Sequence, residues 1–194
     1  MADKMIYTAT FLNKIKEHKS IVSQLIEACQ NDFYELVEMC IASLISQHKI
    51  LIFGNGGSAS QAEHIAAELI GKFYRERMPI PAISLCSNLS IITAISNDIS
   101  FNYVFSRQLE AYAEEHDVAI GLSTSGNSLN IIEAMKEAKD RNLHTAALTG
   151  KDGGNLKNIV DVCIKVPSDD TARIQEIHIL LGHILCEIIE SVLT

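Results

Sequence analysis

A glycine-rich turn followed by a histidine and a carboxylate is the part of this chain best suited to chemistry. The turn reads Gly54-Asn55-Gly56-Gly57-Ser58-Ala59 and joins an apolar run, residues 49–53, to a segment with helical spacing. Backbone N–H groups at such a strand-to-helix turn can bind an anion. His64 and Glu68 follow one helical turn apart, a pair that can ligate a metal or transfer a proton. These residues favour an enzyme that acts on a small anionic molecule.

A second segment, rich in hydroxyl groups, follows another apolar run. It reads Ser123-Thr124-Ser125-Gly126-Asn127-Ser128 and precedes a helix expected to begin near Leu129. A helix N-terminus attracts anions through its free N–H groups and its dipole. A helix cap needs only one hydroxyl, whereas this loop carries four. The excess predicts a binding site for a phosphate monoester, with an ordinary helix cap as the alternative.

The C-terminal segment, Thr171–Leu193, predicts a long helix with polar residues away from its apolar stripe. Gln175 and His183 are two turns apart and lie within about a quarter turn of each other. With the earlier histidine–glutamate pair they offer two imidazoles, a carboxylate and an amide oxygen, a set that could suit Zn²⁺. The alternative for His64 and Glu68 is an ordinary ion pair on the surface of a helix. The alternative for Gln175 and His183 is a side chain that caps the helix or has its hydrogen bonds satisfied in the core. His178 lies nearer the apolar stripe and is interpreted as structural.

Five short apolar runs separated by helical segments predict an α/β fold. The sheet is expected to be parallel, five-stranded and covered by helices on both faces. The runs are residues 49–53, 82–86, 118–122, 145–148 and 160–166. Residues 8–47 have helical spacing and are expected to form two helices. Ligands of such sheets bind at the C-terminal ends of the strands, here residues 54–58, 87–90, 123–128 and 149–154.

The composition predicts a single globular domain. The chain has 194 residues, of which 47% are hydrophobic and 21% are charged, enough to bury a core. The formal net charge is −8 without a basic stripe, which argues against nucleic-acid binding. The five cysteines include no CxxC pair, as expected of free thiols in a reducing compartment. No apolar run is long enough to span a bilayer, so we expect a cytoplasmic protein without membrane contact.

The glycine turn also matches the GxGxxA pattern of dinucleotide-binding folds. That fingerprint needs an acidic residue at the end of the following strand to bind the ribose. The corresponding residues here are Cys86-Ser87-Asn88, which include neither aspartate nor glutamate. A nicotinamide or flavin dinucleotide is therefore disfavoured.

Taken together, these motifs resemble the sugar isomerase (SIS) domain family. The matching segments, in the family's order, are 54–59 with His64 and Glu68, 94–98, 105–108, 123–128, 148–150, 166–168 and 173–183. The joint pattern is far more specific than any one motif. The resemblance implies a flavodoxin-like SIS fold, with one SIS domain over residues 1–194. It also implies that the N-terminal helices, residues 1–48, serve in packing and oligomerisation.

Within the family, the chain is similar to members that isomerise heptose phosphates. The resemblance implies conversion of sedoheptulose 7-phosphate to D-glycero-D-manno-heptose 7-phosphate through an enediol, the first step towards bacterial ADP-heptose. It implies a homotetramer whose active sites lie between subunits. Glu68 would be the base, and His183 the acid/base for the oxygens. The implied substrate contacts are Asn55, Gly56, Gly57, Glu68, Asn97, Asp98, Ser123, Thr124, Ser125, Ser128 and Gln175. The implied ligands of one zinc ion per subunit are His64, Glu68, Gln175 and His183.

The same resemblance leaves two rival functions. Some relatives are non-catalytic tetramers that bind the DnaA replication initiator and lack the glutamate and histidine found here at positions 68 and 183. Because this chain keeps both, the enzyme is favoured over the adaptor. The other rival is a different sugar-phosphate isomerase or a sugar-phosphate sensor, which needs only the phosphate loop. The chain departs from many family members at Asn88, where they carry aspartate, so the role of that loop stays open.

Overall fold

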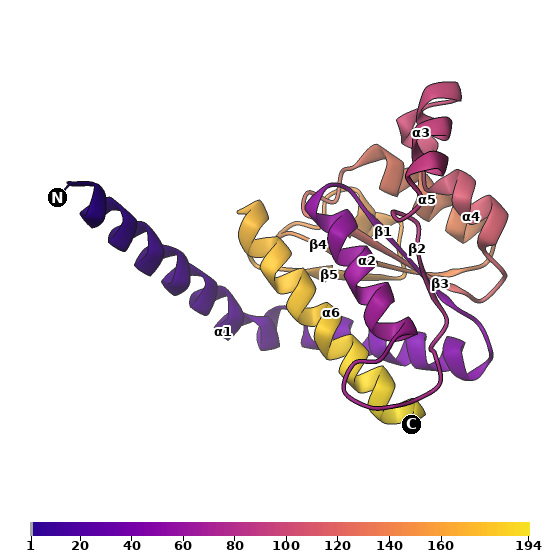
Figure 1. Cartoon of the computed structure of the whole chain (residues 1–194), viewed down its shortest axis with the longest axis horizontal. Coiled ribbons are helices and arrows are strands. Elements are labelled where there is room, and N and C mark those ends of the chain that lie inside the picture. Colours follow the sequence, from indigo (N-terminus) through magenta and orange to yellow (C-terminus); the bar gives the residue numbers. More distant parts are fainter. Residues whose placement is uncertain (1) are drawn as a thin grey trace.

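The chain folds around a five-stranded parallel sheet. The computed structural model describes residues 2–194, and their side chains from Lys4 onward (Figure 1). The strands are β1 (Ile50–Gly54), β2 (Ala82–Ser84), β3 (Val118–Ser123), β4 (His144–Thr149) and β5 (Val162–Lys165). Their order across the sheet is β2-β1-β3-β4-β5, with every neighbouring pair parallel. This is the doubly wound order of flavodoxin-like folds, so the predicted fold class is confirmed.

Helices cover both faces of the sheet. One face is covered by α2 (Gly57–Ile70), α6 (Thr171–Leu193) and the second half of α1 (Ala2–Ile45). The other face is covered by α4 (Ser106–Tyr112) and α5 (Leu129–Asp140), with α3 (Leu89–Asp98) at its rim and short 3₁₀ turns at Phe101–Tyr103 and Leu156–Asn158. Successive residues of β1 enter the two cores alternately, Ile52 on the first side and Phe53 on the second. Burial on both faces explains why β1, and β3 up to Leu122, carry no polar side chain.

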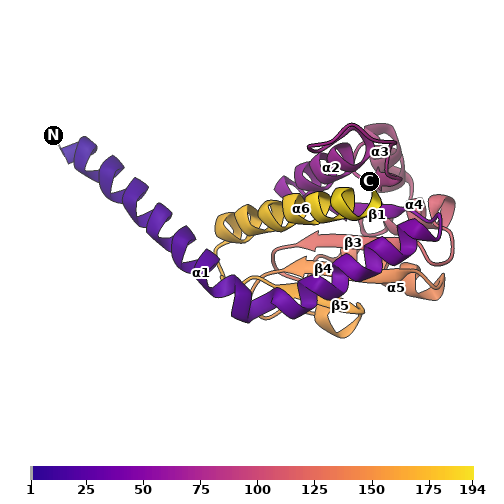
Figure 2. The ribbon, with the colours of Figure 1, turned by 90° about the horizontal axis from the view of Figure 1, so that it is seen from below.

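The N-terminal region forms one helix, α1, and not the two helices that the spacing predicted. No proline or glycine occurs between residues 2 and 45, so nothing in the sequence interrupts the helical hydrogen bonds. The second half of α1 packs on the sheet through Ile21, Cys29, Phe33, Leu36, Val37, Cys40 and Leu44. The first half projects away from the body of the domain (Figure 2).

Helices α2 and α6 lie side by side and carry the histidines and carboxylate singled out above (Figure 1). Gln61 Nε2 of α2 donates to the backbone oxygen of Gln175 in α6 at 2.6 Å. The Asp170 side chain caps α6 by accepting from Ala172 N at 2.9 Å. These contacts fix the two helices at the same edge of the sheet where the strands end.

The cysteines have the free-thiol state that the absence of a CxxC pair predicted. All five cysteines are free thiols, three of them buried and two half-buried. Burial raises the pKa of the Cys186 thiol to about 12, so it stays protonated at neutral pH. Within residues 2–194, no helix combines the length and apolar character needed to cross a bilayer.

Candidate active site

The glycine turn places β1 and α2 against α6. Gly56 has a φ of 55°, a left-handed conformation that favours glycine. At Gly57 an added Cβ would lie 2.7 Å from Nε2 of Gln175, so a larger residue would displace that side chain. Gln175 therefore lies directly against the turn, although the two are more than a hundred residues apart in the sequence.

His64, Glu68 and His183 form a polar cluster where α2 faces α6. The Nε2 atoms of His64 and His183 are 2.9 Å apart, and His64 Nε2 is 3.4 Å from Oε1 of Glu68. Two imidazole nitrogens at hydrogen-bond distance require one donor and one acceptor, so only one of the two carries a proton there. The side chain of Glu68 is 26% exposed, hence reachable by a small molecule. The cluster can exchange protons with a ligand.

Residues 123–128, here called the hydroxyl loop, connect β3 to α5 and present hydroxyl groups that could donate hydrogen bonds to a phosphate. Ser128 occupies the N-cap position of α5 but makes no capping hydrogen bond with its side chain. Its Oγ instead lies 3.2 Å from Oγ of Ser123. Ser125 Oγ accepts from Asn127 N at 3.1 Å, and Thr124 is half-buried beside it. The ordinary helix-cap alternative does not describe Ser128, because its hydroxyl is not used as a cap.

A neighbouring loop after β4 holds the hydroxyl loop in shape. Gly150 N donates to Thr124 O at 3.0 Å, and Asn155 N donates to Oδ1 of Asn127 at 3.0 Å. Gly126 has a φ of 64°, and an added Cβ would lie 2.2 Å from the oxygen of Gly153. Glycine is required here both for its conformation and for this close approach. The loop is therefore pre-shaped before any ligand binds.

Asn130 is a residue of this region that the sequence analysis missed. It lies in the first turn of α5 with 3% exposure, and its side-chain amide pairs with that of Asn55. Each amide nitrogen donates to the other residue's oxygen at 2.8 Å. The pair joins the glycine turn to the hydroxyl loop. An asparagine in the first turn of a helix that follows a serine-rich loop was the available signal, since asparagine is otherwise unfavourable in helices.

Asn97 and Asp98 are not brought into the same cluster. They end α3, where both are exposed and Asn97 Nδ2 donates to Oδ1 of Asp98 at 2.7 Å. Among the described residues, no hydrogen bond joins them to the glycine turn, the hydroxyl loop or the two histidines. In Figure 1, α3 stands out from the rim of the sheet. Their part in substrate binding stays a prediction.

His178 is structural, as predicted. It is fully buried, and its Nε2 donates to the backbone oxygen of Thr149 at the end of β4 at 3.2 Å. Burial lowers its pKa to about 4, so the ring is neutral at physiological pH. The bond attaches α6 to the sheet and leaves His183 as the histidine of α6 that faces α2.

The arrangement defines an α/β protein with a candidate ligand-binding loop at the carboxyl edge of a doubly wound sheet. A family profile described as "SIS domain" matches residues 13–150. The chain is 49% identical over 178 residues to the phosphoheptose isomerase of a Nitratiruptor species, covering 92% of this chain and 95% of the relative. It is 50% identical over 173 residues to a phosphoheptose isomerase of Helicobacter pylori, covering 89% and 90%.

Solved structures agree with these sequence relatives. The phosphoheptose isomerase GmhA from Neisseria gonorrhoeae matches with a TM-score of 0.91 and 40% identity, over 95% of this chain and 99% of that chain. A phosphoheptose isomerase from Francisella tularensis matches with a TM-score of 0.89 and 32% identity, over 95% and 98%. The chain belongs to the SIS domain family, and within it to the phosphoheptose isomerases.

Proposed function

We propose that the protein is an aldose–ketose isomerase that converts sedoheptulose 7-phosphate to D-glycero-D-manno-heptose 7-phosphate. The names of its relatives support a phosphorylated heptose as substrate. The observation that carries the proposal is the cluster of His64, Glu68 and His183, since it puts a carboxylate beside imidazoles where two helices face each other. The hydroxyl loop at the carboxyl end of β3 supports a phosphate anchor.

The reaction moves one proton between carbons and one between oxygens. In the open-chain ketose, the Glu68 carboxylate removes a proton from C1, and the electron pair forms the C1–C2 double bond of an enediol as O2 gains a proton. Loss of the proton on O1 then forms the C1 carbonyl, and Glu68 returns its proton to C2. His183 carries the oxygen protons, a task for which neutral imidazole has both a donor and an acceptor. No net oxidation occurs.

A direct assay tests the function. We expect the purified protein to convert sedoheptulose 7-phosphate to the aldoheptose phosphate without added nucleotide. NMR of the sugar carbons would monitor the conversion. Non-phosphorylated sedoheptulose should react far more slowly, because the hydroxyl loop then has no anion to bind. If the protein shows no turnover and instead binds DnaA, the adaptor function replaces this proposal. Turnover of other sugar phosphates at a higher kcat/KM would reassign the substrate.

We also propose that His64, Glu68, Gln175 and His183 hold one zinc ion per subunit. Tetrahedral zinc places its ligand atoms about 3.3 Å apart, given bonds of about 2.0–2.1 Å. The 2.9 Å and 3.4 Å separations around His64 are near this value. Over residues 2–194, however, no group of three or more His, Cys, Asp or Glu side chains is already spaced to hold a metal. The two imidazoles fit the ion, while Glu68 and Gln175 would have to turn towards it.

A bound zinc would polarise the sugar carbonyl. Coordination would also make Glu68 a poorer base, so its two proposed roles compete. We expect the protein, after equilibration with zinc and dialysis, to retain about one zinc per chain by elemental analysis. The His64→Ala variant should retain much less, and Glu63→Ala, at an exposed position on the same helix, should retain as much as the wild type. Wild-type protein that retains none would disprove the metal site.

We propose a homotetramer with active sites between subunits. The projecting half of α1 supports it, because its large apolar side chains are exposed, among them Tyr7 at 68% and Phe11 at 65%. An apolar groove of about 530 Å³ between α1 and α6 continues this surface. A second copy of the chain would cover both. Sedimentation should give four times the 21.4 kDa chain mass, and a monomer at micromolar concentration would exclude the assembly.

We place the protein in the cytoplasm. Five free thiols, three of them buried, support a reducing compartment. Cell fractionation tests this placement, and recovery from an oxidising compartment would contradict it.

A further inference from the structure

Arg77 and Glu190 form a buried ion pair behind the cluster of proposed catalytic residues. Each side chain is 2% exposed, and Nε of Arg77 lies 3.0 Å from Oε1 of Glu190. Glu190 belongs to α6, whereas Arg77 lies in the loop between α2 and β2. Buried charges are costly unless they are paired and hydrogen-bonded. The pair thus links α6 to the loop that follows α2. These two helices carry the proposed catalytic residues.

The guanidinium of Arg77 binds the C-terminal end of α2. Its Nη2 donates to the backbone oxygen of Glu68, and its Nη1 to that of Leu69, both at 2.8 Å. The last carbonyl groups of a helix have no partner within the helix, and a cation is favourable beside them. Arg77 therefore fixes the backbone of the residue that carries the proposed base.

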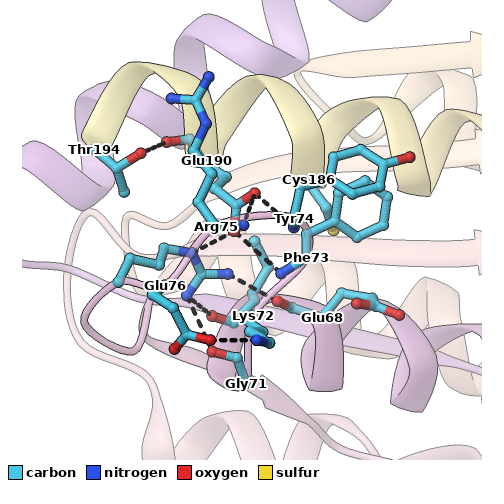
Figure 3. A network of polar contacts seen from close by, with 12 residues as sticks. Glu68, Gly71, Lys72, Phe73, Tyr74, Arg75, Glu76, Cys186, Glu190 and Thr194 are labelled. Atoms are coloured by element: carbon cyan, nitrogen blue, oxygen red, sulfur yellow. Dashed lines mark hydrogen bonds and ion pairs between the residues drawn. The ribbon is translucent and has the colours of Figure 1, made fainter.

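The carboxylate of Glu190 binds the loop that follows α2. It accepts from Phe73 N at 3.1 Å, Tyr74 N at 2.8 Å and Arg75 N at 3.1 Å. Figure 3 shows Glu190 extending from α6 towards this loop, with Glu68 nearby. Burial opposes ionisation, yet these N–H groups and Arg77 hold the pKa of Glu190 below its ordinary value. The carboxylate thus holds the loop as an anion.

The same loop reaches the other proposed catalytic residue. The ring of Phe73 lies 5.8 Å from the ring of His183, centroid to centroid. Glu190 follows His183 by seven residues, two turns along the same face of α6. One ion pair is therefore connected to Glu68 through a backbone carbonyl and to His183 through an aromatic ring.

We propose that the Arg77–Glu190 pair positions Glu68 and His183 relative to each other for proton transfer. Neither residue of the pair belongs to the polar cluster, so both are positioning residues. The inference rests on the proposed function, since it takes the roles of Glu68 and His183 from there. A merely structural pair would contribute to folding stability and leave the turnover of folded protein unchanged.

The chain offers a matched control in the residue that precedes β3. Asp117 is fully buried and accepts from Lys49 N at 2.9 Å and Glu114 N at 2.7 Å. It also pairs with Nζ of Lys49 at 2.8 Å. Like Glu190, it is a buried carboxylate held by backbone N–H groups and a cation. It lies just before β3, and these bonds join it to residues before β1 and β3 rather than to α2 or α6.

The kinetic test compares Arg77→Lys and Glu190→Gln with Asp117→Asn, all at a temperature where each is folded by circular dichroism. Lysine keeps the charge but lacks the planar fork that contacts both helices. We expect the kcat of the first two variants to fall about tenfold or more, while their KM stays within about threefold of the wild-type value. This pattern is expected because the reacting groups would be misplaced. Asp117→Asn should lose thermal stability and keep its kcat. If Glu190→Gln does not fold, Arg77→Lys decides.

A second readout does not depend on activity. The imidazole resonances of His183, observed by NMR in the full-length protein, should shift in Arg77→Lys and stay in place in Asp117→Asn. Unchanged resonances together with an unchanged kcat in Arg77→Lys would overturn the inference. An inactive wild type whose His183 resonances still shift in Arg77→Lys would refute the proposed function and leave the positioning intact.

Discussion

Replacing Glu68 by glutamine is expected to lower kcat by about 10²–10⁴-fold, the usual contribution of a positioned general base. Glutamine keeps the shape and a hydrogen-bonding oxygen near His64, but it cannot accept a proton at neutral pH. The Glu68 side chain is 26% exposed and glutamine has the same shape, so the variant should fold normally and still bind substrate. Steady-state kinetics and calorimetric titration with sedoheptulose 7-phosphate measure the two effects separately.

The matched control is Glu63→Gln on the same helix. Glu63 is exposed one residue before His64, and its loss should leave kcat nearly unchanged. Near-normal turnover in Glu68→Gln would assign the base elsewhere. Loss of turnover accompanied by loss of bound zinc would instead favour the ligand role of Glu68, which separates the two proposals made for this residue.

Removing two hydroxyls from the loop after β3 is the second change with a large expected effect. Ser125→Ala combined with Ser128→Ala should raise KM by about 10²-fold, since each hydrogen bond to a charged group contributes about 1.5–3 kcal/mol. Folding should change little, because Ser128 makes no capping bond. Ser125 accepts one bond from Asn127 N, so a small loss of loop order accompanies its removal.

Inhibition by inorganic phosphate gives an independent measure of the same loop. Its inhibition constant should rise together with KM in the double variant. Ser46→Ala, which removes an exposed serine in the turn before β1, serves as control and should change neither. An unaltered KM in the double variant would mean that the phosphate binds elsewhere.

The sheet could be predicted because central parallel strands are buried on both faces. The short, continuous runs of branched and small apolar residues in β1 and β3 are typical of such central strands. The ends of the strands shifted by one or two residues. Ser123 and Thr149 are polar yet belong to β3 and β4, where they pair with each other across the sheet. Such pairing depends on the neighbouring strand and leaves no trace in local composition.

The polar cluster was predictable in part because helical periodicity reveals which residues share a face. His64 and Glu68 could be paired from their spacing alone. Arg77 and Glu190 could not, because they meet across 113 residues, and Glu190 reads as an ordinary charged residue on α6. Its burial follows from three loop N–H groups that have no sequence signature. The continuity of α1 was likewise missed, since periodicity alone does not show where a helix ends.

The contact between α2 and α6 also sets an order of events during synthesis. His64 and His183 are 119 residues apart, so at about 5–20 residues per second a ribosome completes α6 roughly 6–24 seconds after α2. The hydroxyl loop, residues 123–128, is made about halfway through that interval, and until α6 follows the face of α2 that carries Glu68 has no partner from that helix. If Glu68 and His183 have the proposed roles, a growing polypeptide brings them together only when its last helix emerges.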